Sequence, residues 1–220
     1  MSRTFAVIGL GAFGSTVARD LADAGNDVIG IDRDDGPVSE LADVLREAVI
    51  ADARDEKALR EAGLAACDTA VVAIGGDLEA NIVSVVNAKL IGVEKVWAKA
   101  LSRTHHRILA RLGTDRVIHA EREMGQRVAQ MLHNPVVLDY VSAGNGFYVV
   151  AVTVPDSLEG RTVASLELPR AYDVRCLEVM RGSDALLGGN GAASGAVLAE
   201  GDRMLVLGRR SALRTFAESF

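Results

Sequence analysis

Apolar residues in the first part of the chain fall into short unbroken runs, and longer amphipathic stretches separate them. The runs predict six strands, at residues 5–8, 28–31, 48–51, 69–74, 95–98 and 116–118. The stretches between them have helical spacing and predict helices at residues 13–24, 38–45, 56–62, 78–91 and 102–112. Strands that alternate with helices across short turns predict an α/β fold with a Rossmann-like, doubly wound parallel sheet.

The pattern changes after residue 120. Residues 121–132 predict a connecting helix, which Asn134 and Pro135 end. Strands then dominate, at residues 136–141, 147–154, 174–180, 197–198 and 204–207, with short helices at 162–166 and 211–218. Glycines mark a hairpin turn at 144–146 and a loop at 188–191. We therefore expect a nucleotide-binding domain at 1–134 and a small α+β domain at 135–220, with the linker near 134–138.

A glycine-rich turn follows the first predicted strand, with Gly9, Gly11 and Gly14 in the pattern G-x-G-x-x-G. Gly9 permits the tight turn, Gly11 lets a phosphate approach the backbone, and Gly14 lets the helix pack on the strand. Ala12 and Phe13 lie within the same candidate site. Because a strand precedes the motif and a helix follows, the turn predicts phosphate binding at the helix N-terminus. A strand–helix turn without a ligand is the alternative.

An acidic residue, Asp32, ends the second predicted strand, about 20 residues after the glycines. A carboxylate there accepts hydrogen bonds from the adenosine ribose hydroxyls and repels a 2′-phosphate. The position therefore favours NAD-type or ADP/ATP-type ligands over NADP. Arg33 and Arg19 weaken that exclusion, and a plain acid at a strand end is the alternative.

The carboxyl ends of the other predicted strands meet at the same edge of a parallel sheet. We expect six further residues from these ends to border the ligand: Asp52, Ala53, Ile74, Gly75, Lys99 and Arg103. The first pair would border the base, and the second pair would pass under the ribose and phosphates. The two cations could meet a phosphate or could equally be solvated surface residues.

Composition narrows the class of protein. The 220 residues carry a net charge of −6, which argues against a nucleic-acid surface. No apolar run is long enough to span a membrane, and the first strand begins too early for a signal peptide. Cys67 and Cys176 are isolated, which favours free thiols in a reducing cytosol. We expect a cytoplasmic protein.

Candidate catalytic residues are few. The four histidines are His105, His106, His119 and His133, and none has the spacing of a base with its orienting partner. A small NAD-dependent oxidoreductase is one alternative, but it needs a base in the second domain. A redox-sensing DNA-binding repressor is another, but it needs a basic helix-turn-helix. We expect a nucleotide that is sensed rather than turned over, and no enzyme.

Several stretches together resemble a known family. In the first half they are FAVIGLGAFG at 5–14, DARD at 52–55, VVAIG at 71–75 with Asn81, VWAKA at 96–100, and residues 106–118 and 121–125. In the second half they are residues 154–166, 174–182 and 198–208. They resemble the RCK-domain (regulator of potassium conductance) subunits of Trk/Ktr-type potassium uptake systems, of the KtrA/TrkA kind, over nearly the whole chain.

The resemblance implies a ring, typically an octamer built from dimers, that docks on a membrane potassium-translocating subunit at the inner face of the cell membrane. ATP/ADP or NAD(H) would bind at the Rossmann-like site and gate transport by changing the ring's shape. The glycines would hold the diphosphate and Asp32 the ribose. In some members the acid matching Glu121 helps to hold a divalent cation between protomers, although a glutamate that opens a helix also complements the helix dipole.

The chain departs from the family at Ala12, where many members have an arginine that reaches a γ-phosphate. A methyl group cannot offset a third phosphate's charge, so we hypothesise weak discrimination of ATP from ADP, or a preference for NAD(H) or AMP-like ligands. Some relatives bind a cyclic dinucleotide at the C-terminal domain, near Val174, Leu177 and Arg181. Strand core and a solvated strand end are the alternative for these three residues.

Overall fold

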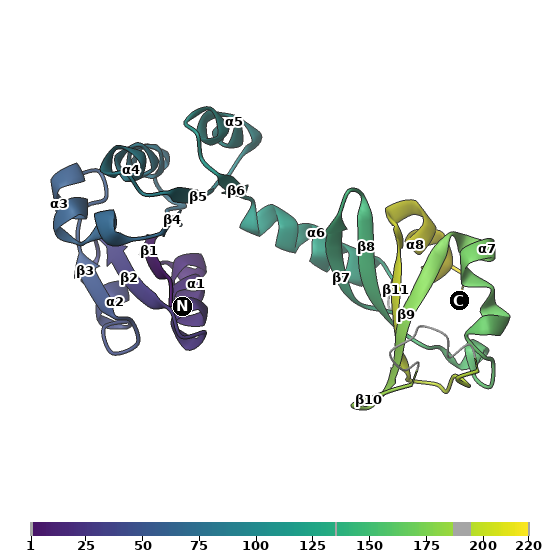
Figure 1. Ribbon diagram of the computed structural model, residues 1–220. Helices are drawn as coiled ribbons and strands as arrows, with labels where there is room; N and C mark the ends of the chain where they lie inside the picture. The colour runs from purple at the N-terminus through teal and green to yellow at the C-terminus, as the bar shows by residue number, and fades with distance from the viewer. Residues whose placement is uncertain (1, 135, 187–194, 220) are drawn as a thin grey trace. The chain divides into compact units, whose positions relative to one another are not determined.

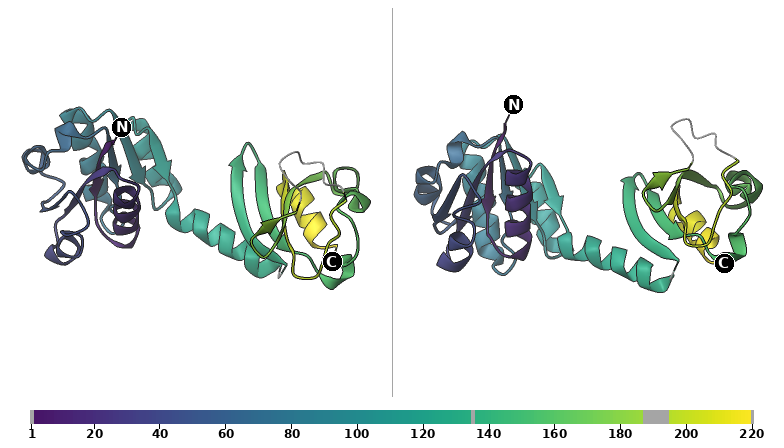
Figure 2. Two further views of the ribbon diagram at one scale, coloured as in Figure 1. Left: turned by 60° about the horizontal axis from the view of Figure 1, so that its bottom comes forward. Right: turned by 90° about the horizontal axis from the view of Figure 1, so that it is seen from below.

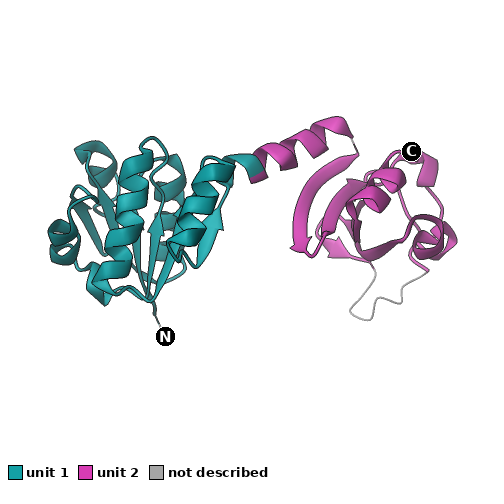
Figure 3. Cartoon of the chain, turned by 90° about the horizontal axis from the view of Figure 1, so that it is seen from above, with its two compact units in different colours: residues 1–122 teal, residues 123–220 magenta. Residues whose placement is uncertain are grey.

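The computed structural model describes residues 2–134, 136–186 and 195–219 (Figure 1). The chain forms two compact units, residues 1–122 and 123–220, which divide within helix α6 (Ala120–His133) (Figure 3). None of the helices in the described ranges has the length and apolar character needed to cross a bilayer. Pro135 and the glycine-rich loop expected at 188–191 lie outside the described residues.

Unit 1 is built on a six-stranded parallel sheet with the order β3-β2-β1-β4-β5-β6. Its strands are β1 (Thr4–Ile8), β2 (Asp27–Asp32), β3 (Glu47–Ile50), β4 (Thr69–Val72), β5 (Lys95–Lys99) and β6 (Arg116–Ile118). This order confirms the predicted doubly wound, Rossmann-like sheet. The winding direction reverses between β1 and β4, which is the switch point where such sheets bind ligands.

Helices cover both faces of this sheet (Figures 1 and 2). The helices are α1 (Ala12–Asp23), α2 (Asp35–Ser39), α3 (Glu56–Glu61), α4 (Leu78–Ile91) and α5 (Arg103–Arg111), with a 3₁₀ turn η1 at Leu64–Ala66. Side chains of β1 alternate between the two resulting cores. Val7 packs in the cluster that holds residues of α1 and α2, whereas Ala6 and Ile8 pack in the cluster that holds residues of α3, α4 and α5. Burial on both faces explains the unbroken apolar runs.

The helix predicted at 38–45 is wrong. Helix α2 ends at Ser39, and the chain then passes through turns to β3. Val38, Leu41 and Leu45 are all buried, and their spacing is helical. Turn hydrogen bonds, such as the 3.1 Å bond from the Leu41 N–H to the Val38 carbonyl, bury the same side chains without a regular helix.

Unit 2 contains an antiparallel sheet with the order β10-β9-β11-β8-β7. Its strands are β7 (Val137–Gly144), β8 (Phe147–Thr153), β9 (Val174–Arg181), β10 (Asp184–Ala185) and β11 (Arg203–Arg209). Its other elements are the 3₁₀ turns η2 (Asp156–Leu158) and η3 (Ala164–Leu166) and the helices α7 (Leu168–Tyr172) and α8 (Arg210–Ala217). Phe216 of α8 packs with Val174, Met204 and Val206 in one core. The unit confirms the predicted small α+β fold.

Unit 2 differs from the prediction in several details. Val197 makes a single bridge to Thr162 instead of a strand at 197–198. The helix expected at 162–166 is the shorter turn η3. Helix α7 has no counterpart in the prediction, because Glu167 and Asp173 bound it in left-handed conformations, at φ of 45° and 55°, that glycine would normally signal.

Candidate functional site

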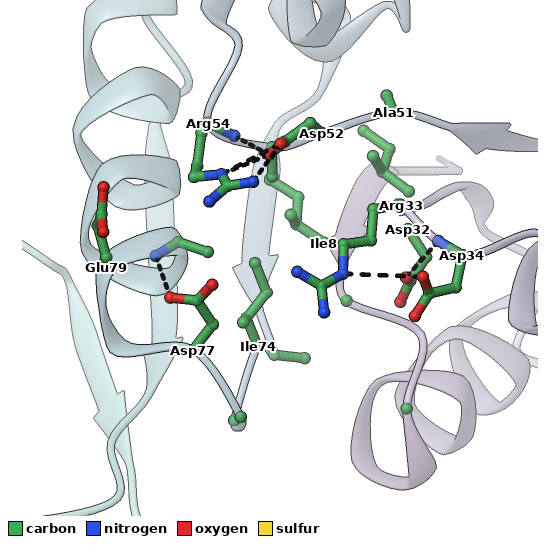
Figure 4. Close-up of a pocket in the computed structure, with 18 of the residues that line it drawn as sticks. Ile8, Asp32, Arg33, Asp34, Ala51, Asp52, Arg54, Ile74, Asp77 and Glu79 are labelled. Atoms are coloured by element: carbon green, nitrogen blue, oxygen red, sulfur yellow. Dashed lines mark hydrogen bonds and ion pairs between the residues drawn. The ribbon is translucent and has the colours of Figure 1, made fainter.

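A cavity of about 580 Å³ lies at the carboxyl ends of the strands around the switch point of unit 1 (Figure 4). Four segments line it: Ile8, Gly9 and Gly11 after β1, residues 31–34 after β2, residues 51–54 after β3, and residues 73–80 after β4. The edge of the sheet therefore brings together Asp32, Asp52 and Ile74, which the sequence analysis assigned to one site.

The glycine turn is sterically specified. Gly9 has φ of +93°, in the left-handed region. A Cβ on Gly14 would lie 1.8 Å from the Gly9 carbonyl oxygen, so the turn and α1 can approach this closely only without that atom. A Cβ on Gly11 would meet nothing within 4 Å, which leaves room beside the backbone for a ligand.

Helix α1 begins at this turn and has no side-chain cap. Its N-cap residue, Gly11, offers no side-chain acceptor, whereas Asp55, Asp77 and Ser102 cap α3, α4 and α5. The N–H groups of a first helical turn point out of the N-terminus and lack partners within the helix. The turn that precedes α1 lines the cavity through Gly9 and Gly11, so these N–H groups can bind an anion there.

Asp32 is tied to the glycine turn. One carboxylate oxygen accepts a 2.6 Å hydrogen bond from the Leu10 N–H, and the other accepts a 3.0 Å bond from the Asp34 N–H. These bonds hold a carboxylate beside the turn, where hydroxyl groups of a sugar can donate to its remaining lone pairs.

The two arginines of the cavity are paired with neighbouring acids (Figure 4). Arg54 Nη2 lies 2.6 Å from Asp52 Oδ2, and the Arg54 N–H donates to Oδ1 at 2.9 Å. These bonds lower the pKa of Asp52 to about 2. Arg33 Nε lies 3.7 Å from Asp34 Oδ1. In the described chain, acidic side chains that line the cavity outnumber basic ones by five to two. A phosphate would therefore meet peptide N–H groups rather than free cations.

Lys99 lies beside the cavity but does not line it. Its side chain is 9% exposed, and Nζ lies 2.5 Å from Glu121 Oε1 and 5.6 Å from the centre of the Phe13 ring. A Cβ on Gly75 would lie 3.0 Å from Nζ, so the lysine packs directly against the loop after β4. Lys99 also holds the pKa of Glu121 below its usual value by a hydrogen bond.

Arg103 and Glu121 line a second cavity, of about 470 Å³, together with His119 and Arg122. The structure thus separates Arg103 from the glycine turn. Among the described residues, no three histidine, cysteine, aspartate or glutamate side chains gather into a metal site. The Glu121 carboxylate already pairs with Lys99, so the described residues of one chain do not fit a divalent cation at this position.

Helix α4 supplies polar contacts that the sequence analysis did not assign. Asn81 Nδ2 donates to the carbonyls of Ile74 at 2.7 Å and Lys99 at 3.2 Å, which joins the ends of β4 and β5. Asn87 Nδ2 donates to carbonyls in the loop after β3. The available signal in the sequence was the three-residue spacing of Asn81, Ser84 and Asn87 in a mostly apolar helix.

The histidines of unit 1 lie away from the first cavity. His105 is buried, and its Nε2 lies 3.1 Å from Asn81 Oδ1. Burial lowers the pKa of His105, which favours the neutral ring. His106 Nδ1 lies 2.9 Å from His119 Nε2, and the two rings are stacked.

In unit 2 the three residues considered for a cyclic dinucleotide have different environments. Val174 is fully buried in the core and Leu177 is exposed. Arg181 makes an ion pair with Asp202, with two nitrogen–oxygen distances of 2.8 Å. None of the three lines either of the two cavities of unit 1 described above.

Family models match both halves of the chain. The model of the TrkA-N domain matches residues 5–120, and the model of the TrkA-C domain matches residues 147–220. The chain is 34% identical over 211 residues to the Ktr system potassium uptake protein A of Vibrio alginolyticus, covering 96% of this chain and 94% of that protein. It is 33% identical over 187 residues to the Ktr system potassium uptake protein C of Bacillus subtilis (strain 168), covering 85% of each.

Solved structures share the fold at low identity. A structure of the GsuK channel superposes with a TM-score of 0.69 at 14% identity, covering all of this chain and 39% of that one. The GsuK channel bound to NAD superposes with a TM-score of 0.66 at 13% identity, covering 97% of this chain and 38% of that one. The Shewanella denitrificans Kef CTD in AMP-bound form superposes with a TM-score of 0.50 at 21% identity, covering 59% of this chain and 80% of that one. Both domain models and the extent of the Ktr similarity show that the chain belongs to the TrkA/Ktr family of potassium uptake proteins.

Proposed function

We propose that this chain is a regulatory subunit of a potassium uptake system and that an adenine nucleotide in the first cavity controls it. The observation that carries the proposal is the uncapped N-terminus of α1, which opens on the cavity beside Asp32. A diphosphate would bind the first-turn N–H groups, the ribose would bind Asp32, and the base would lie toward the loop after β3. The NAD-bound GsuK channel and the AMP-bound Kef CTD hold ligands of this class.

The charges favour a ligand with few phosphates. Arg33 and Arg54 are paired with acids, and Ala12 at the start of α1 is neutral. NAD(H), AMP or ADP would therefore bind in preference to ATP, because each added phosphate brings charge that no free cation of the described cavity offsets. A divalent cation at Glu121 would have to displace Lys99 from its ion pair with this carboxylate. The proposed site therefore includes no divalent cation.

Gating follows from differential binding. A nucleotide shifts an oligomer between two shapes only if it binds those shapes with different affinity. We propose that several copies of this chain assemble into a ring on the cytoplasmic side of a membrane potassium-translocating subunit. Such a ring would convert occupancy of the cavity into a change in the partner's conductance.

The test is a thermal-shift series with AMP, ADP, ATP, NAD and NADH, followed by a transport assay. A ligand at about 100 times its dissociation constant stabilises the native state by about 2.7 kcal/mol. Gly11→Ala should reduce the shift, because its Cβ would project into the open space beside the turn. Gly125→Ala is the matched control, since its Cβ would also meet nothing within 4 Å but lies on α6.

Transport then tests the regulatory role. Co-expression with a Ktr-type membrane subunit in a strain that lacks potassium uptake should restore growth at low potassium, and Gly11→Ala should abolish the response to nucleotide. Absence of any nucleotide shift would contradict the proposed site. Steady consumption of NADH with a small carbonyl compound would contradict the regulatory assignment and favour an oxidoreductase.

A further inference from the structure

Helix α4 carries a row of three polar side chains, Asn81, Ser84 and Asn87, at intervals of three residues. All are buried, with exposed fractions of 0%, 0% and 7%. Burial of a polar group costs free energy unless the group is hydrogen-bonded. The hydrogen bonds of these three side chains therefore show which interactions offset the cost of burying them.

Asn87 holds the loop after β3. Its Nδ2 donates to the Ala53 carbonyl at 3.1 Å and to the Arg54 carbonyl at 3.0 Å. Ser84 Oγ lies 3.5 Å from the same Ala53 carbonyl but 2.5 Å from the Ala80 carbonyl of its own helix, so Asn87 makes the shorter bonds to the loop. Two consecutive carbonyls of the loop thus point toward α4, although more than 30 residues separate them from Asn87 in sequence.

The orientation of one peptide connects Asn87 to the cavity. In a trans peptide the carbonyl and the following N–H point in opposite directions. The Ala53 carbonyl points to Asn87, and the N–H of the same peptide, on Arg54, donates to Asp52 Oδ1 at 2.9 Å. Asn87 therefore fixes the peptide that holds Asp52, while Asn87 itself does not line the cavity.

We infer that Asn87 is a positioning residue for the base of the bound nucleotide, acting through the loop at 51–54. The inference rests on the proposed function, which places the base against this loop. Phosphates would bind at the glycine turn, on the other side of Asp32 in the sheet order. Loss of Asn87 should therefore lower the affinity for every ligand with the same base by the same factor, whatever the number of phosphates in the ligand.

The test compares the affinities of the full chain for AMP, ADP and NAD by isothermal titration, at a temperature where each variant is folded. Asn87→Leu removes both hydrogen bonds and should weaken each ligand that the parent binds by about tenfold, a similar factor for each. Asn87→Ser, whose hydroxyl can serve one carbonyl, should give about a threefold loss and covers the case in which the leucine variant does not fold.

Two matched variants separate positioning from a general loss of stability. Val85→Ala, at a fully buried position on the same helix, should lower the melting temperature and leave the three affinities unchanged. Gly11→Ala should change the ratio of ADP to AMP affinity, which Asn87→Leu should leave constant.

Parent-like affinities in Asn87→Leu or in Asn87→Ser would overturn the inference and leave the proposed function standing. A loss that grows with phosphate content would also overturn it, because the effect would then lie at the glycine turn. A parent chain that binds none of the three nucleotides would overturn both the inference and the proposed function.

Discussion

The carboxylate of Asp32 accepts a 2.6 Å hydrogen bond from the backbone N–H of Leu10, 22 residues earlier in the chain. The acid that ends β2 is thereby fixed to the turn that ends β1. A sugar bound at this carboxylate and a phosphate bound at the helix N-terminus would be held by parts that cannot move independently.

Asp32→Ala should lower the affinity for AMP and for NAD by at least tenfold, since a hydrogen bond to a charged group contributes about 1.5–3 kcal/mol. It should also lower the free energy of unfolding, because the Leu10 N–H loses its acceptor. Titration calorimetry and urea denaturation measure the two effects. Asp34→Ala is the control, since the Asp34 carboxylate pairs with Arg33, at 3.7 Å, and not with the glycine turn. Equal effects of the two substitutions would contradict a special role for Asp32.

Gly14→Ala should destabilise unit 1 by about 3 kcal/mol or more, because the added methyl group would meet the Gly9 carbonyl oxygen at 1.8 Å. The Gly9 backbone and the Ala73 Cβ, which would lie 3.1 Å from the added atom, leave little room for relaxation. Thermal denaturation of the variant, beside Gly11→Ala as a substitution into open space, measures the difference. A Gly14→Ala chain as stable as Gly11→Ala would show that the turn is less tightly packed than described.

Ala12→Arg should raise the ratio of ATP to ADP affinity by about tenfold, through a charge-assisted hydrogen bond to the third phosphate. The residue is exposed at the first position of α1, so the longer side chain can be accommodated. Ala12→Gln adds a similar length without charge and should leave the ratio near that of the parent. An unchanged ratio in the arginine variant would mean that another group already meets that phosphate.

Asp202→Asn should lower the free energy of unfolding at neutral pH by about 2 kcal/mol. The carboxylate is buried, and its ion pair with Arg181 holds the pKa of Asp202 below its usual value of 3.8. An ionised carboxylate with a lowered pKa stabilises the fold fully above pH 3.8, and that contribution disappears as the pH falls through the folded-state pKa. Urea denaturation across this range should show the gap between variant and parent closing in acid. A gap independent of pH would indicate a packing effect.

The sequence predicted most of unit 1 because its strongest signals have local physical causes. Gly9 and Gly14 are required by backbone conformation and close packing, and Asp32 ends a strand whose four inner residues are buried. The spacing of Val38, Leu41 and Leu45 was misleading, because a series of turns can bury the same residues as a helix.

Residues that act through tertiary contacts were harder to predict. Lys99 looks like a surface cation in sequence, and only the fold shows that it is buried against Glu121. Asn87 has no motif, and its partners lie more than 30 residues away. Pairings of this kind depend on how the elements pack, which a single sequence does not specify.

Because Gly11 at the start of α1 has no side chain to accept a hydrogen bond, a bound ligand would supply the acceptor for the first-turn N–H groups. At α4 the Asp77 side chain accepts a hydrogen bond from the Ala80 N–H, so that first-turn amide has a partner whether or not anything is bound. At α1 the same protection would come from the phosphate. Hydrogen exchange at Ala12, Phe13 and Gly14 would then report occupancy of the cavity directly.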